Sequence, residues 1–131
     1  MRNTRWAAVV ASVLVLLAVG CRAAIPVYNV TDTPVAASKP NPNLDEVGKA
    51  IQRAGVALGW QMKETKPGHM LGTLVLRKHV AVVDVNYSVK SYSIRYKDST
   101  ELGYDGQNIH PNYNGWIQNL DKGIRAQLSV L

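Results

Sequence analysis

Apolar and polar residues alternate along two stretches in the second half of the chain, residues 79–87 and 91–98. An alternation with a period of two predicts β-strands that bury one face and expose the other to water. Only residues 88–90 connect the two strands, and so short a connection favours antiparallel pairing. The predicted buried positions are Ala81, Val83, Val85 and Tyr87 in the first strand, and Tyr92, Ile94 and Tyr96 in the second.

A β-hairpin is predicted immediately before these strands, over residues 60–77. Its first arm alternates in the same way, and the dipeptide Pro67-Gly68 supplies the turn between the arms. Residues 77–78 alone connect the hairpin to the next strand. The four strands together therefore predict an antiparallel meander.

The apolar period changes from two to about 3.6 on both sides of this strand region, over residues 43–59 and 115–131. Two amphipathic helices are therefore predicted. Asn43 is the expected N-cap of the first, with Glu46 placed as in a capping box, and Gly59 is the expected C-terminal cap. The apolar faces consist of Leu44, Val47, Ile51, Ala54 and Leu58 in the first helix, and of Ile117, Leu120, Ile124 and Leu128 in the second.

These elements predict an α+β fold in the order α-β-β-β-β-α. Both helices would cover one face of a four-stranded antiparallel sheet, which gives a two-layer sandwich in a single domain over residues 43–131. A short leading strand over residues 25–30 is left as an alternative, because Pro26 suits the start of an edge strand.

The first twenty residues have the layout of a secretory signal peptide. Two arginines form a positively charged N-terminal region, and the following residues 6–20 contain one polar residue, Ser12. That run of about 15 residues is shorter than the roughly 20 that a membrane-spanning helix needs. The next segment, residues 21–42, is rich in Ala, Pro, Asn and Thr and predicts a flexible tether behind a lipidated N-terminus.

The single cysteine of the chain, Cys21, directly follows the signal. The run Ala18-Val19-Gly20-Cys21 resembles a bacterial lipobox. This resemblance implies cleavage before Cys21, a diacylglycerol on its thiol and an acyl chain such as palmitate on its new amino group, and stable anchoring needs two or more chains. By the same resemblance, the non-aspartate residue Arg22 favours the outer membrane, with the inner membrane and surface exposure left open. The alternatives are an ordinary signal peptide with an unrelated cysteine and an uncleaved anchor helix.

The charge of the chain excludes one class of partner. The formal charge of +6 falls to +4 once the signal and its two arginines, Arg2 and Arg5, are removed. A mildly basic protein without a concentrated patch is not a dedicated nucleic-acid binder, so no nucleic-acid partner is predicted. A lone cysteine also cannot form an internal disulfide, and lipidation would account for a thiol in an exported protein.

No catalytic or metal-binding arrangement is evident in the sequence. The histidines His69, His79 and His110 fall in separate segments without metal-ligand spacing, so no metal or other cofactor is predicted. Asp84 lies close to Arg95 of the next predicted strand, which predicts a cross-strand ion pair. The chain also lacks the G-x-S-x-G motif and a phosphate-binding glycine loop. We therefore predict that the protein is not an enzyme.

One segment, residues 104–116, combines aromatic, amide, acidic and imidazole side chains within a short span. Such mixtures occur at protein-binding hot spots and on sugar-binding surfaces. The alternative is structural: Tyr113 and Trp116 would anchor the second helix on the sheet while the asparagines form turns and caps. The candidate surface residues are Tyr104, Asp105, Asn108, His110, Asn112, Tyr113, Asn114 and Trp116.

The sequences YSIRYKDS, residues 92–99, and IHPNYNGWI, residues 109–117, resemble a group of small proteobacterial lipoproteins of unassigned function. The resemblance covers most of the chain that follows Cys21. It implies a periplasm-facing lipoprotein and supplies no activity or catalytic residues.

The expected function is that of an exported, lipid-anchored binding or assembly module. It would dock a protein of the cell envelope through residues 104–116 or through an exposed sheet edge. The alternative is a glycan-binding domain directed at peptidoglycan. An enzyme is the third hypothesis, and it would require a pocket that gathers Tyr104, Asp105 and His110.

Overall fold

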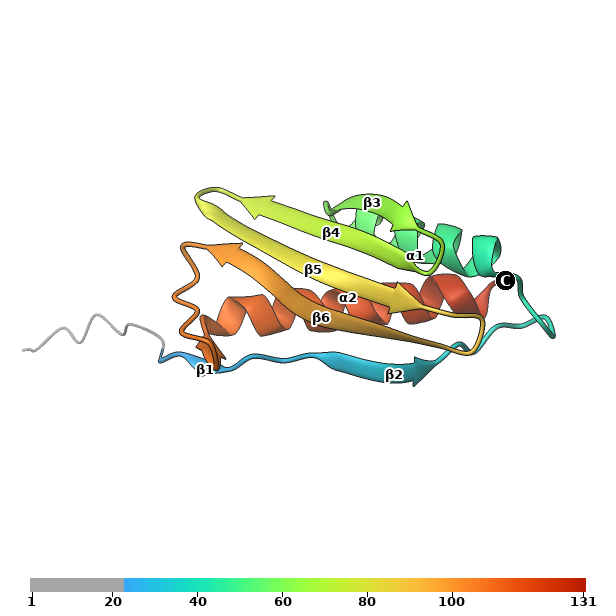
Figure 1. Cartoon of the computed structure of the whole chain (residues 1–131), viewed down its shortest axis with the longest axis horizontal. Coiled ribbons are helices and arrows are strands. Elements are labelled where there is room, and N and C mark those ends of the chain that lie inside the picture. The colour runs from blue at the N-terminus through green and yellow to red at the C-terminus, as the bar shows by residue number, and fades with distance from the viewer. Residues whose placement is uncertain (1–22) are drawn as a thin grey trace, which may run out of the picture.

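The structure is a computed structural model that describes residues 23–131 (Figure 1). Cys21 and the signal segment lie outside the described residues, so the signal-peptide and lipidation predictions stay predictions. The described chain forms two helices, a five-stranded antiparallel sheet and a separate pair of two-residue strands. The predicted α+β class is therefore confirmed, and the predicted four-stranded sheet is one strand too small.

The central sheet has the strand order β2-β6-β5-β4-β3, and all neighbouring strands are antiparallel. Strands β3 to β6 form the predicted meander, because each of their connections is too short for anything but antiparallel return. The strands of the sheet are β2 (Val30–Pro34), β3 (Gln61–Lys66), β4 (His69–Leu76), β5 (His79–Tyr87) and β6 (Ser91–Thr100), while β1 (Ile25–Pro26) pairs with β7 (Asn108–Ile109).

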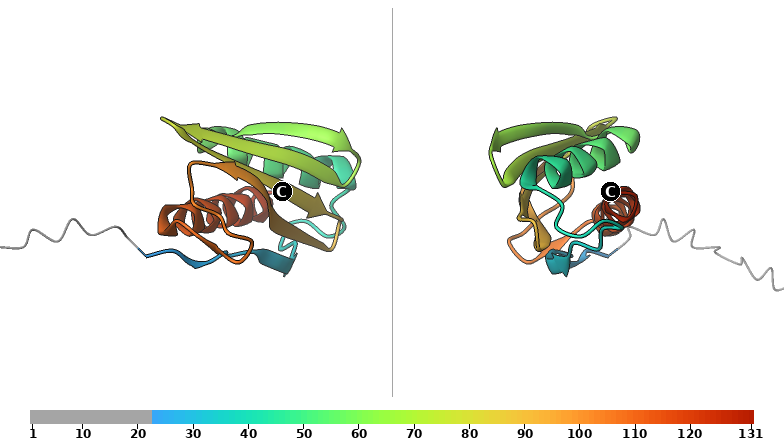
Figure 2. Two further views of the ribbon diagram at one scale, coloured as in Figure 1. Left: turned by 60° about the vertical axis from the view of Figure 1, so that its left-hand side comes forward. Right: turned by 90° about the vertical axis from the view of Figure 1, so that its right-hand side faces the viewer.

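Both helices, α1 (Leu44–Ala57) and α2 (Pro111–Ser129), cover the same face of the sheet, as Figure 2 shows. The helices contact each other side by side, so the layout is the predicted two-layer sandwich. Burying each aliphatic side chain between these layers contributes about 1.5–3 kcal/mol. The fully buried positions include Val47, Ile51, Ile117, Leu120 and Ile124 from the helices, and Ala81, Val83, Val85 and Ile94 from the sheet.

The helix α1 begins and ends as its sequence predicts. The Asn43 side-chain oxygen accepts a hydrogen bond from the Glu46 backbone N–H at 2.8 Å, and the Asn43 amide donates to the Glu46 carboxylate at 2.8 Å. Gly59 has a φ of +88°, a left-handed conformation that glycine adopts without steric penalty. One predicted apolar contact is wrong: Leu58 lies past the last helical residue and is exposed.

The flexible tether predicted over residues 21–42 is wrong for residues 25–26 and 30–34, which pair as strands. The second of these segments, β2, adds a fifth strand beside β6, so the domain includes chain before residue 43. The leading strand left as an alternative over residues 25–30 is present only in part, because residues 25–26 form β1, residues 27–29 are not in a strand, and β2 starts at Val30. β2 lacks a clear period-two signal because its register shifts between Val30 and Thr33 and because Asp32 adopts a φ of +46°.

The second helix starts earlier than predicted, at Pro111 instead of residue 115. Proline suits this first helical position because its missing N–H would have no partner there. His110 precedes it as the N-cap, and its Nδ1 accepts a hydrogen bond from the Asn112 backbone N–H at 3.1 Å. The polar residues before the apolar face of α2 therefore belong to its first turn.

Candidate functional site

The candidate surface of residues 104–116 lies at the end of the molecule where β1 and β7 pair (Figure 1). Asp105 stabilises its own loop there. Its carboxylate accepts hydrogen bonds from the backbone N–H groups of Asn108 at 2.7 Å and Gln107 at 2.9 Å. These bonds hold the pKa of the Asp105 carboxyl below its usual range. The carboxylate therefore forms a turn, as the structural alternative predicts.

Asn114 joins α2 to the first residues of the described chain. Its Nδ2 donates a hydrogen bond to the Pro26 carbonyl at 2.9 Å, and its Oδ1 accepts one from the Tyr28 backbone N–H at 3.0 Å. Asn108 lies opposite Pro26 in the β1–β7 pair. With His110 acting as the cap of α2, the polar residues of this segment mainly hold backbone groups in place.

The aromatic residues of the segment differ in burial. Tyr113 is fully buried, so its assignment to a binding surface is wrong: it anchors α2 on the sheet, as the alternative proposed. Its hydroxyl has no hydrogen-bond partner within residues 23–131, and burial raises its pKa. Trp116 is partly buried, with its ring centroid 6.4 Å from that of His79.

Tyr104 keeps an exposed ring, at 37% relative exposure. Its ring centroid lies 3.9 Å from that of Tyr96, and the Tyr96 ring meets Tyr113 edge-on at 5.7 Å. The structure therefore brings these three tyrosines into one cluster. It does not gather Tyr104, Asp105 and His110 around one of the described pockets, as the enzyme hypothesis would require.

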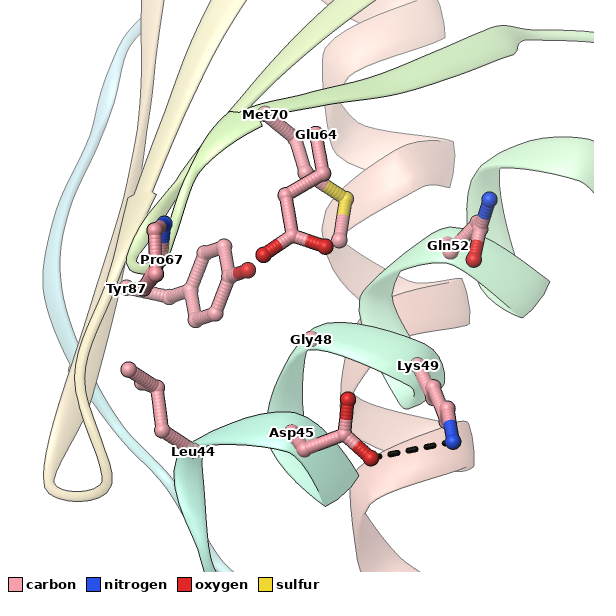
Figure 3. Close-up of a pocket in the computed structure, with 9 residues that line it drawn as sticks. All are labelled: Leu44, Asp45, Gly48, Lys49, Gln52, Glu64, Pro67, Met70 and Tyr87. Atoms are coloured by element: carbon pink, nitrogen blue, oxygen red, sulfur yellow. Dashed lines mark ion pairs between the residues drawn. The ribbon is translucent and has the colours of Figure 1, made fainter.

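A different site lies between α1 and the β3–β4 hairpin, in a pocket of about 330 Å³ (Figure 3). The first two turns of α1 form one side, and the sheet forms the other. The side chains that line the pocket include Leu44, Asp45, Lys49 and Gln52 from α1, and Glu64, Met70 and Tyr87 from the sheet.

The pocket is shaped by the absence of a side chain at Gly48. A Cβ atom at this position would lie 2.7 Å from the Tyr87 hydroxyl oxygen, which is closer than such atoms can approach. Tyr87 is the last residue of β5 and belongs to its buried face, so its ring reaches from the sheet toward α1. The glycine therefore lets the phenol lie directly against the helix.

The pocket holds one unpaired carboxylate beside this phenol. Asp45 forms an ion pair with Lys49 at 2.9 Å, whereas Glu64 forms none with any residue of the described part. Figure 3 shows the Glu64 carboxylate pointing toward the Tyr87 hydroxyl. Burial raises the pKa of Tyr87, and the negative charge of Glu64 raises it further. The phenol therefore stays protonated at neutral pH and can act as a donor.

The uncovered face of the same hairpin carries a chain of polar contacts. The Thr65 hydroxyl lies 2.5 Å from Nδ1 of His69, and Nε2 of His69 lies 2.7 Å from the Asp84 carboxylate. Lys97 lies 3.6 Å from the same carboxylate. The predicted Asp84–Arg95 ion pair is wrong: the two residues are opposite in register, but His69 and Lys97 contact the carboxylate instead. We interpret these contacts as cross-strand side-chain interactions that stabilise the sheet.

A buried carboxylate links α2 to the sheet. The Tyr92 hydroxyl donates a hydrogen bond to Asp121 at 2.5 Å, and Arg125 forms an ion pair with the same side chain at 3.0 Å. Both oxygens of the buried Asp121 therefore have partners, which is the condition for a buried charge to be tolerated. This arrangement stabilises the packing of α2 and offers no free group to a ligand.

The described residues contain neither a metal-binding cluster nor a helix that could span a membrane. Within residues 23–131, no three His, Asp or Glu side chains lie close enough together to hold a metal ion. Neither α1 nor α2 combines the length and the hydropathy that crossing a membrane requires.

Comparisons of the chain with protein-family models, with curated protein sequences and with solved structures find no match. The resemblance to small proteobacterial lipoproteins therefore stays a prediction.

The pocket could not be predicted from the sequence, because its residues are scattered along the chain and individually ordinary. Glu64 is one charged residue in a polar strand, and Tyr87 occupies a regular buried position. Gly48 was the available signal, because it falls on the buried face of α1 where larger residues are the rule. A glycine there indicates that another group approaches the helix closely.

Proposed function

We propose that the protein is an exported lipoprotein anchored through Cys21, in the outer membrane and facing the periplasm. The support is the charged start, the apolar run and the lipobox-like residues 18–21 of the sequence. Lipidation would also explain why the chain has a single cysteine at that position.

Replacing the cysteine tests the anchor. We expect Cys21→Ala to leave an unprocessed precursor without fatty-acid label, while the wild-type chain is shortened and labelled. Ser12→Ala, which changes the signal but leaves Cys21 in place, is the matched control and should be processed normally. Normal processing of Cys21→Ala would overturn the lipoprotein assignment.

We further propose that the folded domain is a non-enzymatic module that binds an envelope protein. The observation that carries this proposal is the unpaired Glu64 carboxylate beside the Tyr87 phenol in the pocket against α1. The carboxylate and the oxygen of the neutral phenol can both accept hydrogen bonds, and Leu44 and Met70 supply apolar walls, so the pocket suits the N–H donors of a lysine or arginine side chain of a partner. Arginine is favoured because its planar head can bond both groups while its stem contacts Leu44 and Met70.

A photo-reactive amino acid at Gln52, on the rim of the pocket, tests this binding in cells. We expect a specific cross-link to an envelope protein from Gln52 and none from the exposed control position Lys122 on α2. Glu64→Gln should reduce the yield several-fold, whereas Glu101→Gln, at an exposed position outside the pocket, should leave it unchanged. Equal yields from both glutamate variants would contradict the proposed pocket.

A glycan-binding domain is the second candidate, and one observation favours it. The exposed Tyr104 ring, stacked on Tyr96, borders a hollow with Asp98 and Glu101. Sugars bind to such aromatic faces when polar groups stand beside them. Tyr104→Ala should then reduce co-sedimentation with isolated peptidoglycan, while Tyr28→Ala, with the same 37% exposure, should not. If neither variant changes co-sedimentation, this candidate fails.

A further inference from the structure

The distance between the proposed anchor and the folded domain is short. Three residues, 22–24, separate Cys21 from Ile25, the first residue of β1, so four residue-to-residue steps join the two. An extended chain spans at most about 3.6 Å per residue, so Ile25 lies within about 14 Å of a lipidated Cys21. The headgroup layer of one leaflet is itself about 5–8 Å thick. The domain therefore has almost no free tether.

Residues 25–28 are hydrogen-bonded to the rest of the domain. Ile25 lies opposite the fully buried Ile109 in the β1–β7 pair, and the Val27 N–H donates to the Gln107 carbonyl at 3.0 Å. Asn114 of α2 bonds the backbone on both sides of Val27. If Cys21 is anchored in a membrane, this end of the domain must therefore lie close to the membrane surface.

Several segments meet at this end. Figure 1 shows the β4–β5 turn, the end of β6, the following loop and the start of α2 at the same end of the long axis as β1. Contacts confirm the arrangement: His79, just after the turn, donates a hydrogen bond from Nδ1 to the Glu101 carbonyl at 2.8 Å, and its ring lies near Trp116. This end of the domain is thus formed by residues 25–28, 75–78 and 101–107.

This end of the domain carries side chains that suit a lipid–water boundary. Ile25, Tyr28 and Tyr104 are each 37% exposed, and Leu76 is 42% exposed. Tyrosine is favoured at membrane interfaces because one end of its ring is apolar and the other polar. The turn adds the basic pair Arg77 and Lys78, which can contact lipid phosphates.

We propose that this end of the domain, formed by residues 25–28, 75–78 and 101–107, lies directly on the membrane that anchors Cys21 and contacts its lipid headgroups. The proposal rests on the proposed lipidation of Cys21. It also places the pocket away from the bilayer, because the start of α1 and the β3–β4 turn lie toward the other end of the long axis (Figure 1).

The test uses the full lipidated chain in vesicles of phosphatidylethanolamine and phosphatidylglycerol. Because Cys21 is the only cysteine and its thiol is blocked by lipid, a cysteine introduced elsewhere can be labelled alone with an environment-sensitive fluorophore. Tyr104→Cys and Lys78→Cys report on the proposed contact surface. Val89→Cys, exposed in the β5–β6 turn at the far end, is the control. Headgroup-labelled and acyl-labelled quencher lipids are then added.

We expect several-fold stronger quenching at positions 104 and 78 than at position 89. Lys78→Cys keeps the test valid if Tyr104→Cys disturbs the tyrosine cluster. Equal quenching at all three positions, in protein that floats with the vesicles, would overturn the membrane contact while leaving the anchor intact. Protein that does not float would instead refute the lipid anchor, and the contact that rests on it would fall with it.

Discussion

Two tyrosines at different places along the helix–sheet interface show how the same group can be structural in one region and available in another. Tyr113, in the region near β1 and β7, has a fully buried ring and a hydroxyl without a partner in the described part. Tyr87, in the region near the start of α1, has a buried ring as well, but its side chain lines a pocket beside Glu64.

The difference arises from what covers each ring. Tyr96 and Tyr104 cover Tyr113, because the loop after β6 folds back over the start of α2. At Tyr87 the covering element is α1, which presents Gly48 and leaves space beside the phenol. The region rich in functional-looking residues is therefore mostly structural, and the plainer region holds the free carboxylate.

The largest expected effect is a loss of stability when the buried ring of Tyr113 is removed. Tyr113→Ala should reduce the free energy of unfolding by about 3–5 kcal/mol, the usual loss for a large aromatic side chain removed from a core. Tyr104→Ala, at an exposed position of the same cluster, should cost about 1 kcal/mol or less. Urea unfolding of both variants measures the two losses. Similar values for the two would contradict the assigned difference in burial.

Removing only the hydroxyl groups should give effects of opposite sign at two buried tyrosines. Tyr92→Phe removes the donor to Asp121 and should destabilise by about 2 kcal/mol, because that hydrogen bond is charge-assisted. Tyr113→Phe removes a buried hydroxyl that has no partner and should stabilise by about 1 kcal/mol. Denaturant unfolding measures the free energy of unfolding of both variants and of the wild type. Destabilisation by Tyr113→Phe would mean that the Tyr113 hydroxyl has a hydrogen-bond partner.

The regular elements could be predicted from the sequence because their patterns record burial directly. Alternation in β5 and β6 predicted buried positions such as Val83, Val85 and Ile94, and the 3.6-residue period predicted the face of α2 with Ile117 and Ile124. These patterns are reliable where one face meets a core and the other meets water. The capping pair Asn43 and Glu46 was equally local, so its geometry followed from spacing alone.

The remaining features depend on partners far away in the chain. β2 forms because it pairs with the edge of β6. Its own five residues, which include Asp32 and Pro34, do not predict a strand. The partner of Asp84 comes from β4, the neighbour of β5 on the side away from Arg95, where His69 contacts the carboxylate. The pocket needs Gly48 and Glu64 to meet, and nothing in their local sequence links them.

The pocket region can be tested through the close approach at Gly48. Gly48→Ala should destabilise by about 1 kcal/mol, since the strain of about 1–3 kcal/mol from crowding the Tyr87 hydroxyl is partly offset by the better helix propensity of alanine. Tyr87→Phe removes the nearest atom and should recover part of this loss in the double variant. The four proteins of this cycle are compared by thermal unfolding. Independent, additive effects would show that the phenol does not lie against the helix.

The smallest expected effect is on stability at alkaline pH. Burial raises the pKa of Tyr113, so above the ordinary tyrosine pKa of about 10 the unfolded chain loses a proton that the folded chain keeps. Stability is therefore complete below pH 10 and falls as the pH rises further. At pH 10.5 one such tyrosine accounts for a loss of about 0.8 kcal/mol, which Tyr113→Phe should abolish. Urea unfolding at pH 8 and 10.5 gives the change for each protein, and Tyr104→Phe, at an exposed position, is the control. An equal alkaline loss in wild type and Tyr113→Phe would place the Tyr113 hydroxyl in contact with water, as at Tyr104, and would remove the contrast between the two regions.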